Sequence, residues 1–149
     1  ALDHIQLPEL YPVRTELEAL AARLAARHAT PEEIRVLAGM IDEDRASLGD
    51  PPALARANRR FHHQIHLASH NRYLVQQLNL VHRSMALMAR TTLAAKGRDS
   101  VTLDEHQAIV DAIGKRDEAG AEQALRRHIS MAYETRLKED ARLHDEDGA

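Results

Sequence analysis

Residues 53–81 read ALARANRRFHHQIHLASHNRYLVQQLNLV, and this stretch decides the fold class. Over 53–69, apolar residues recur every three or four positions, as on one face of an amphipathic helix: Leu54, Phe61, Ile65 and Ala68. A short break at 70–71 follows, and the same spacing resumes over 72–95 through Leu74, Leu78, Val81, Met85 and Met88. Two amphipathic helices with so short a connection are typical of an antiparallel helical bundle.

The rest of the chain repeats this pattern. Thr30-Pro31-Glu32-Glu33 is a helix start signal, because Thr caps, Pro suits the first helical position and Glu favours the positive helix end. Gly49-Asp50-Pro51-Pro52 ends the helix that starts there. Strand signals are lacking. The remaining helices are predicted at about 8 or 9 to 28, 102–115 and 117–143, so we predict an all-α fold, an antiparallel helical bundle of six to seven helices.

Composition narrows the class of protein. The 149 residues fit one domain, and because aromatic residues make up only 3%, aliphatic side chains must fill the core. Cysteine is absent, which excludes disulfides and thiolate metal sites. No run approaches the roughly 20 apolar residues of a membrane span, and the first residues do not resemble a secretory signal, so we expect a cytoplasmic protein. The net charge of −3, with interleaved signs, matches a free-standing nucleic-acid binder poorly.

Histidine is unusually frequent, with 10 residues, and some of its positions suggest a metal site. Asn58 and His62 are four apart, so they lie on one face of their helix, one turn apart. His106 and His128 lie on two later helices of the same bundle. Three imidazoles and one amide oxygen could converge there on a divalent cation such as Zn, Ni, Co, Fe or Mn.

Other readings of these histidines stay open. A single helical histidine is more often on the surface, or a satisfied polar group in the core, than a ligand. His62, His66 and His70 also share a helix face, which gives a rival pair at four-residue spacing. We expect four histidines outside these spacing patterns to be solvated: His4, His28, His63 and His144.

Four stretches of the chain resemble the motifs of one known family. They are VRTELE at 13–18, ANRRFH at 57–62 with LASHNRYL at 67–74, DEHQAIVDAI at 104–113, and AEQALRRH at 121–128. These are similar to motifs of the FCD domain, the C-terminal effector-binding domain of the FadR subfamily of GntR transcription regulators. The resemblance covers roughly residues 10–138. Its motifs are individually loose but jointly specific.

The resemblance implies a metal site made of one acidic residue and three histidines. In this sequence, the positions that match those of the family are Asn58, His62, His106 and His128. The family more often has Asp at the first position, so this chain departs from the pattern there. Asn keeps an oxygen donor but brings no charge, so we expect weaker metal affinity and a stronger hold on a nearby anion. The alternative is that water replaces Asn58 as ligand. The metal is a divalent transition ion, Zn, Ni or Mn.

The resemblance also implies a small carboxylate effector, held beside the metal by arginine. Arg14 matches the family's first-helix arginine, and Glu18, one turn later, could orient it; the alternative is a surface salt bridge between the two. Gln77, His82, Arg83 and Ser84 interrupt the apolar stripe of their helix, and Arg83 is the second predicted effector contact.

These inferences lead to one predicted organisation and function. Residues 1–8 form a linker or entry arm, 9–143 the effector-binding and dimerisation domain, and 144–149 a frayed acidic tail. The domain is predicted to act as a homodimer that changes DNA binding by an N-terminal winged helix-turn-helix domain, which this sequence lacks. We expect a regulator and no enzymatic activity. The alternatives are a metal-dependent hydrolase, for which Glu105 is available as general base, and a purely structural dimerisation module.

Overall fold

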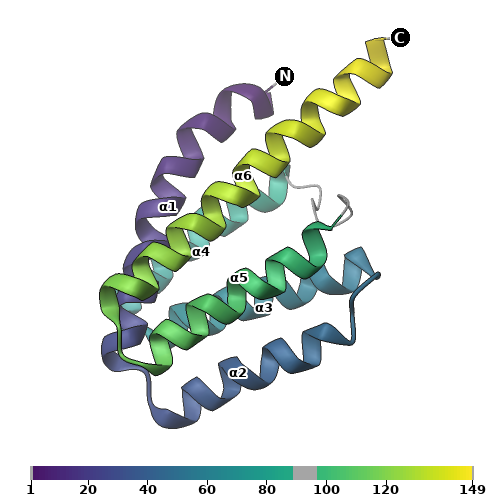
Figure 1. Cartoon of the computed structure of the whole chain (residues 1–149). Coiled ribbons are helices and arrows are strands. Elements are labelled where there is room, and N and C mark those ends of the chain that lie inside the picture. The colour runs from purple at the N-terminus through teal and green to yellow at the C-terminus, as the bar shows by residue number, and fades with distance from the viewer. Residues whose placement is uncertain (1, 89–96, 149) are drawn as a thin grey trace.

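The computed structural model describes residues 2–88 and 97–148, with side chains described for 6–87 and 97–146. The described residues form six helices and no strand: α1 (Leu2–His28), α2 (Pro31–Arg45), α3 (Pro51–Ala68), α4 (Arg72–Met88), α5 (Arg98–Gly114) and α6 (Glu118–Gly148). Figure 1 shows α1 and α6 running alongside each other, with α2 at the opposite edge of the bundle. Helix α1 packs most extensively against α6 and also contacts α3, α4 and α5. The predicted all-α bundle is therefore confirmed.

Local capping explains where α2, α3 and α4 begin. Thr30 forms a capping box: its hydroxyl accepts a hydrogen bond from the Glu33 amide at 3.1 Å, and the Glu33 carboxylate accepts one from the Thr30 amide at 2.9 Å. The Asp50 carboxylate accepts from the Ala53 amide at 3.2 Å and caps α3. The Asn71 side chain does the same for α4 by accepting from the Leu74 amide at 3.0 Å.

The chain ends differ from the prediction. Residues 2–8 are the first turns of α1 and not a linker or entry arm, although Pro8 and Pro12 lie inside that helix. Burial of Leu7 and Tyr11, with Tyr11 stacked on Tyr133 of α6 at 4.2 Å between ring centroids, offsets the hydrogen bonds that proline removes. The predicted frayed tail is helical through Gly148.

Other helix ends shift for local reasons. In the last turns of α6, Arg142 pairs with Glu139 and Glu146 at three- and four-residue spacing, which supports the helix beyond its predicted end at 143. Helix α5 begins four residues earlier than predicted, directly after Gly97, whose φ of 75° only glycine adopts easily. The predicted extension of the fourth helix over 89–95 lies outside the described residues.

The core is aliphatic, as the composition predicts, with Leu37, Ile41, Phe61, Ile65 and Leu78 among its fully buried members. The buried face of α1 includes two charged residues. Val13 is 51% exposed, while the adjacent face with Arg14, Glu18 and a series of alanines is buried: Ala19, Ala21, Ala22, Ala25 and Ala26. Small alanine side chains let neighbouring helices approach α1 closely, and this close packing brings two charged residues into the interior. No helix among the described residues is long and apolar enough to cross a membrane.

Candidate functional site

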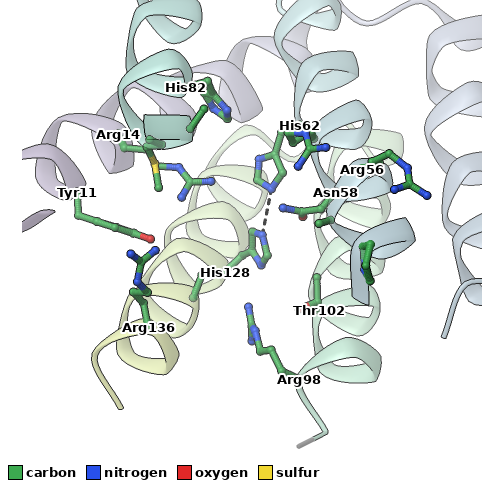
Figure 2. Close-up of a pocket in the computed structure, with 16 residues that line it drawn as sticks. Tyr11, Arg14, Arg56, Asn58, His62, His82, Arg98, Thr102, His128 and Arg136 are labelled. Atoms are coloured by element: carbon green, nitrogen blue, oxygen red, sulfur yellow. Dashed lines mark hydrogen bonds between the residues drawn. The ribbon is translucent and has the colours of Figure 1, made fainter. Parts of the chain in front are cut away.

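Three histidines from three helices meet inside the bundle. His62 of α3, His106 of α5 and His128 of α6 are each at most 3% exposed, and ligand atoms of the three lie within 4.8 Å of one another. The Nε2 atoms of His62 and His128 are 3.1 Å apart, along the dashed line in Figure 2. Tetrahedral zinc, with Zn–N bonds of about 2.0–2.1 Å, separates its ligand nitrogens by about 3.4 Å. The spacing of these two nitrogens is close to that of a metal site.

Carboxylates fix which nitrogen of these rings carries hydrogen. His62 Nδ1 donates to Glu18 Oε2 at 2.7 Å, and His128 Nδ1 donates to Glu105 Oε1 at 2.7 Å. An ionised carboxylate only accepts, so the hydrogen of each neutral ring is on Nδ1 and the Nε2 lone pairs face each other. Two opposed lone pairs repel unless a cation lies between them. Carboxylate–histidine pairs of this kind accompany protein metal sites and raise the basicity of the ligand.

Buried polar atoms without hydrogen-bond partners also favour a metal site near these histidines. Asn58 Oδ1 and both ring nitrogens of His106 are buried and have no hydrogen-bond partner. His106 is held in position by stacking on Phe61, with 4.1 Å between ring centroids. A buried unsatisfied polar group costs about 1–3 kcal/mol. A divalent cation would satisfy Asn58 Oδ1 and one His106 nitrogen, so the residues fit the predicted ligand set.

Burial also keeps these rings in the form that binds metal. Burial lowers the pKa of His106 and His128 well below the usual value, and each is lowered further by the histidines beside it. Burial lowers the pKa of His62 as well, although Glu18 opposes that effect. All three imidazoles are therefore neutral at neutral pH, and neutral imidazole is the metal ligand.

Two of these histidines, His62 and His128, border a cavity of about 570 Å³ whose lining is rich in arginine. Five arginines line it together with His62, His82 and His128, and the described lining contains no carboxylate: Arg14, Arg56, Arg59, Arg98 and Arg136. Figure 2 shows Arg14 and Arg98 pointing from different sides into the space beside His128. Arg14 is 8% exposed, and its Nε is buried without a partner. Such a cavity suits an anion of small-molecule size.

A sequence model of the FCD domain matches residues 9–131 of this chain. The chain belongs to the FCD domain family. Its relatives include the galactonate operon transcriptional repressor of Escherichia coli K12, 34% identical over 85% of this chain and 56% of that protein. Another is the probable D-xylose utilization operon transcriptional repressor of Paenarthrobacter nicotinovorans, 34% identical over 83% of this chain and 55% of that protein. A third is the putative L-lactate dehydrogenase operon regulatory protein of Escherichia coli K12, 30% identical over 91% and 54%.

This FCD domain spans just over half the length of those curated relatives. Among solved structures, Escherichia coli McbR/YncC superposes with a TM-score of 0.77 over 90% of this chain and 65% of that chain, at 19% sequence identity. Streptococcus agalactiae GntR gives a TM-score of 0.69 over 82% of this chain and 55% of that chain, at 24% identity. At these identities the superpositions establish the fold alone.

Most of the predicted site residues lie together in this FCD domain. The three histidines have ligand atoms within 4.8 Å of one another, and Asn58 and Arg14 line the adjoining cavity. Arg83 does not: its side chain is exposed and does not line the cavity, so we do not assign it to the site. Of the histidines expected to be solvated, 28, 63 and 144 are exposed, and the side chain of His4 lies outside the described residues.

The role predicted for Glu18 differs from the one observed. Instead of orienting Arg14, its two oxygens accept hydrogen bonds from His62 at 2.7 Å, His66 at 2.6 Å and His82 at 2.8 Å. Burial tends to raise the pKa of Glu18, but the three histidines together hold that pKa well below its usual value. Glu18 is 1% exposed, which also excludes a surface salt bridge with Arg14.

Sequence reasoning missed four arginines of the cavity: Arg56, Arg59, Arg98 and Arg136. The last two are each paired with a carboxylate. Arg98 donates to both oxygens of Glu105 at 3.0 and 2.8 Å, and Glu105 in turn holds His128. Arg136 pairs with Asp140 one turn later, at 3.2 Å. A signal was available, because both arginines stand at four-residue steps from a predicted ligand along the same helix: Arg98, Thr102 and His106 on α5, and His128, Ala132 and Arg136 on α6.

Proposed function

We propose that this chain is the ligand-sensing domain of a GntR-type transcription regulator, which binds a divalent metal and a small organic acid. One observation carries the proposal: three neutral imidazoles cluster in the interior, and two of them line a cavity together with Asn58, whose amide oxygen is unpartnered, and five arginines, with no described carboxylate in the lining. The relatives are transcriptional regulators, two of them named for operons of galactonate and L-lactate metabolism. Because such regulators act on chromosomal DNA, we also propose a cytoplasmic location.

The proposed metal ligands are Asn58, His62, His106 and His128. Imidazole and amide oxygen suit Zn, Ni or Mn. When bound, the cation supplies a positive charge and open positions for carboxylate oxygens. The nearest carboxylates, Glu18 and Glu105, accept hydrogen bonds from His62 and His128, so they hold these ligands in place without belonging to the proposed ligand set.

The proposed effector is an anion whose carboxylate lies between the metal site and Arg14. The guanidinium of Arg14 lies 5.6 Å from the centre of the Tyr11 ring, which restrains its position, and its Nε is free to donate to a ligand. A neutral sugar would leave the arginines desolvated and unpaired, so we expect discrimination against it. The relative named for D-xylose utilization makes this comparison informative.

Helix α4 links the site to a proposed homodimer face. On one side of α4, His82 donates to Glu18. On the other, Tyr73, Leu80 and Leu87 are 73%, 53% and 90% exposed and stand seven residues apart, the spacing of a seam between paired helices. If ligand binding shifts α4, the packing of a second copy on this row changes with it. This change would also alter the relative position of the DNA-binding domains proposed to precede each copy.

The test is calorimetric binding of D-galactonate, L-lactate and D-xylose to the zinc-loaded and the metal-free chain. We expect the acids to bind only the loaded chain and xylose to bind neither. Arg14→Gln should weaken acid binding at least 10-fold, whereas Arg23→Gln, an exposed arginine on the same helix, should not. Acid binding that survives both metal removal and Arg14→Gln would overturn the proposal.

The two alternative functions have less support. As a hydrolase the chain would need a free general base, but Glu105 is held by Arg98 and His128. A purely structural module does not explain why Asn58 Oδ1 and His106 are buried without partners beside a cationic cavity.

A further inference from the structure

A second group of possible metal ligands surrounds Glu18. Ligand atoms of Glu18, His62 and His66 lie within 4.8 Å of one another. His82 of α4 also reaches the group, with its Nε2 2.8 Å from the same Oε1 that His66 Nε2 approaches at 2.6 Å. We propose that Glu18, His66 and His82 bind a second divalent cation, while His62 lies between the two sites.

The number of histidines on Glu18 exceeds what orienting a ligand requires. One carboxylate oxygen is enough to hold His62, and Oε2 does so at 2.7 Å. Oε1 gathers two further imidazoles from different helices, α3 and α4. In each of these contacts a hydrogen lies between an imidazole nitrogen and a carboxylate oxygen. A cation can replace both hydrogens if the two imidazole nitrogens move away from Oε1 by roughly 0.5–0.8 Å, to the separation of about 3.3–3.4 Å that bonds of about 2.0–2.1 Å require.

The burial of the three ligands leaves one of them, His82, able to make such a movement. Glu18 and His66 are 1% and 2% exposed, so surrounding side chains hold them in place. The side chain of His82 is 28% exposed and lines the cavity, so it has room to move outward. The rings of His66 and His82 meet edge to face, with 5.2 Å between centroids and an inclination of 70°, so the two imidazoles already lie side by side at Glu18. Ions can enter from the cavity, and open coordination positions would face it.

Charge also favours a cation at this site. The four ligands proposed for the first metal are neutral, whereas Glu18 brings a full negative charge. Two imidazoles with one carboxylate form a ligand set that zinc and ferrous iron accept with open positions remaining. Because Glu18 also hydrogen-bonds His62, and because two divalent ions repel, we expect the two sites to fill one after the other.

The test is a titration of the untagged, metal-free chain with Co²⁺, followed by native mass spectrometry and visible absorption. We expect two ions in the wild-type chain and one in His82→Ala, with the absorption of the second ion lost. His106→Ala should retain the ion of the Glu18 site. His63→Ala is the matched control, since His63 is exposed next to His62, and it should bind two. His82→Gln keeps an N–H donor toward Glu18 and serves if His82→Ala folds poorly, as judged by circular dichroism.

The outcomes separate this proposal from the proposed function. One ion at saturation that His82→Ala keeps and His106→Ala loses would overturn the second site and leave the first. One ion that His82→Ala loses and His106→Ala keeps would support the Glu18 site and remove the first. Two ions persisting in both His82 variants would overturn the proposal.

Discussion

Asn58→Asp adds a negative charge at the one proposed ligand position that departs from the ligand set expected from the family resemblance. Asn58 Oδ1 is buried and unpartnered, so a carboxylate oxygen in its place would not disrupt an existing hydrogen bond to that atom. We expect the substitution to tighten divalent-metal binding. It should also weaken binding of an organic acid, because the bound ion would present less net charge to the cavity.

The expected change in the free energy of metal binding follows from two opposing contributions. At an effective dielectric of about 20, a unit charge 4 Å from a divalent ion gains about 8 kcal/mol of attraction. Removing a carboxylate from water costs several kcal/mol, and the asparagine oxygen already contributes as a ligand. We therefore expect a net gain of about 1.4–2.8 kcal/mol, or roughly a 10- to 100-fold lower Kd for metal.

The measurement is competitive titration of Zn²⁺ against a chelator of known affinity, with calorimetry of galactonate binding to the loaded chain. Asn79→Asp is the control, because it makes the same chemical change at an exposed position of α4. Equal or weaker metal binding by Asn58→Asp, with Asn79→Asp unchanged, would refute the reasoning and remove Asn58 from the ligand set.

Three further predictions concern the surroundings of the site. Glu105→Gln should weaken metal binding about 10- to 100-fold, because His128 Nδ1 loses its carboxylate acceptor; an unchanged Kd contradicts this. The free energy of unfolding of the metal-free chain should fall as pH drops below about 6.5, by up to about 1.4 kcal/mol per pH unit for each of His62, His106 and His128. Burial lowers their pKa in the folded state, so the unfolded chain takes up protons that the folded chain does not; urea unfolding at pH 7.5, 6.5 and 5.5 measures the slope, and a flat profile argues against it. Leu80→Asp should convert a dimer to a monomer in sedimentation, and a persisting dimer places the interface elsewhere.

Helix positions could be predicted where local chemistry decides them. Thr30 and Asp50 cap helices through hydrogen bonds that span three residues, so the sequence nearby holds the whole signal. The start of α1 could not be predicted in this way, because Pro8 argues against a helix and the burial of Leu7 and the contact of Tyr11 with Tyr133 of α6 offset it. The burial of Arg14 and Glu18 on α1 could not be predicted for a related reason, since a face that includes charged residues does not follow hydrophobic periodicity.

The candidate site likewise has a part that local sequence predicts and a part that it does not. Asn58 and His62 share a helix face by spacing alone, so their proximity was predictable. The role of Glu18 was not, because it depends on how α1 packs against α3 and α4 and brings His66 and His82 to one carboxylate. Residues that gain their function from contacts between distant helices leave little trace in the local pattern.

The most direct test of the metal site is anomalous X-ray diffraction from crystals of the zinc-loaded, untagged chain, collected on both sides of the zinc absorption edge. We expect an anomalous peak for a zinc ion at about 2.0–2.1 Å from Nε2 of His62, Nε2 of His128 and one ring nitrogen of His106. A loaded crystal with no peak among these three rings would contradict it.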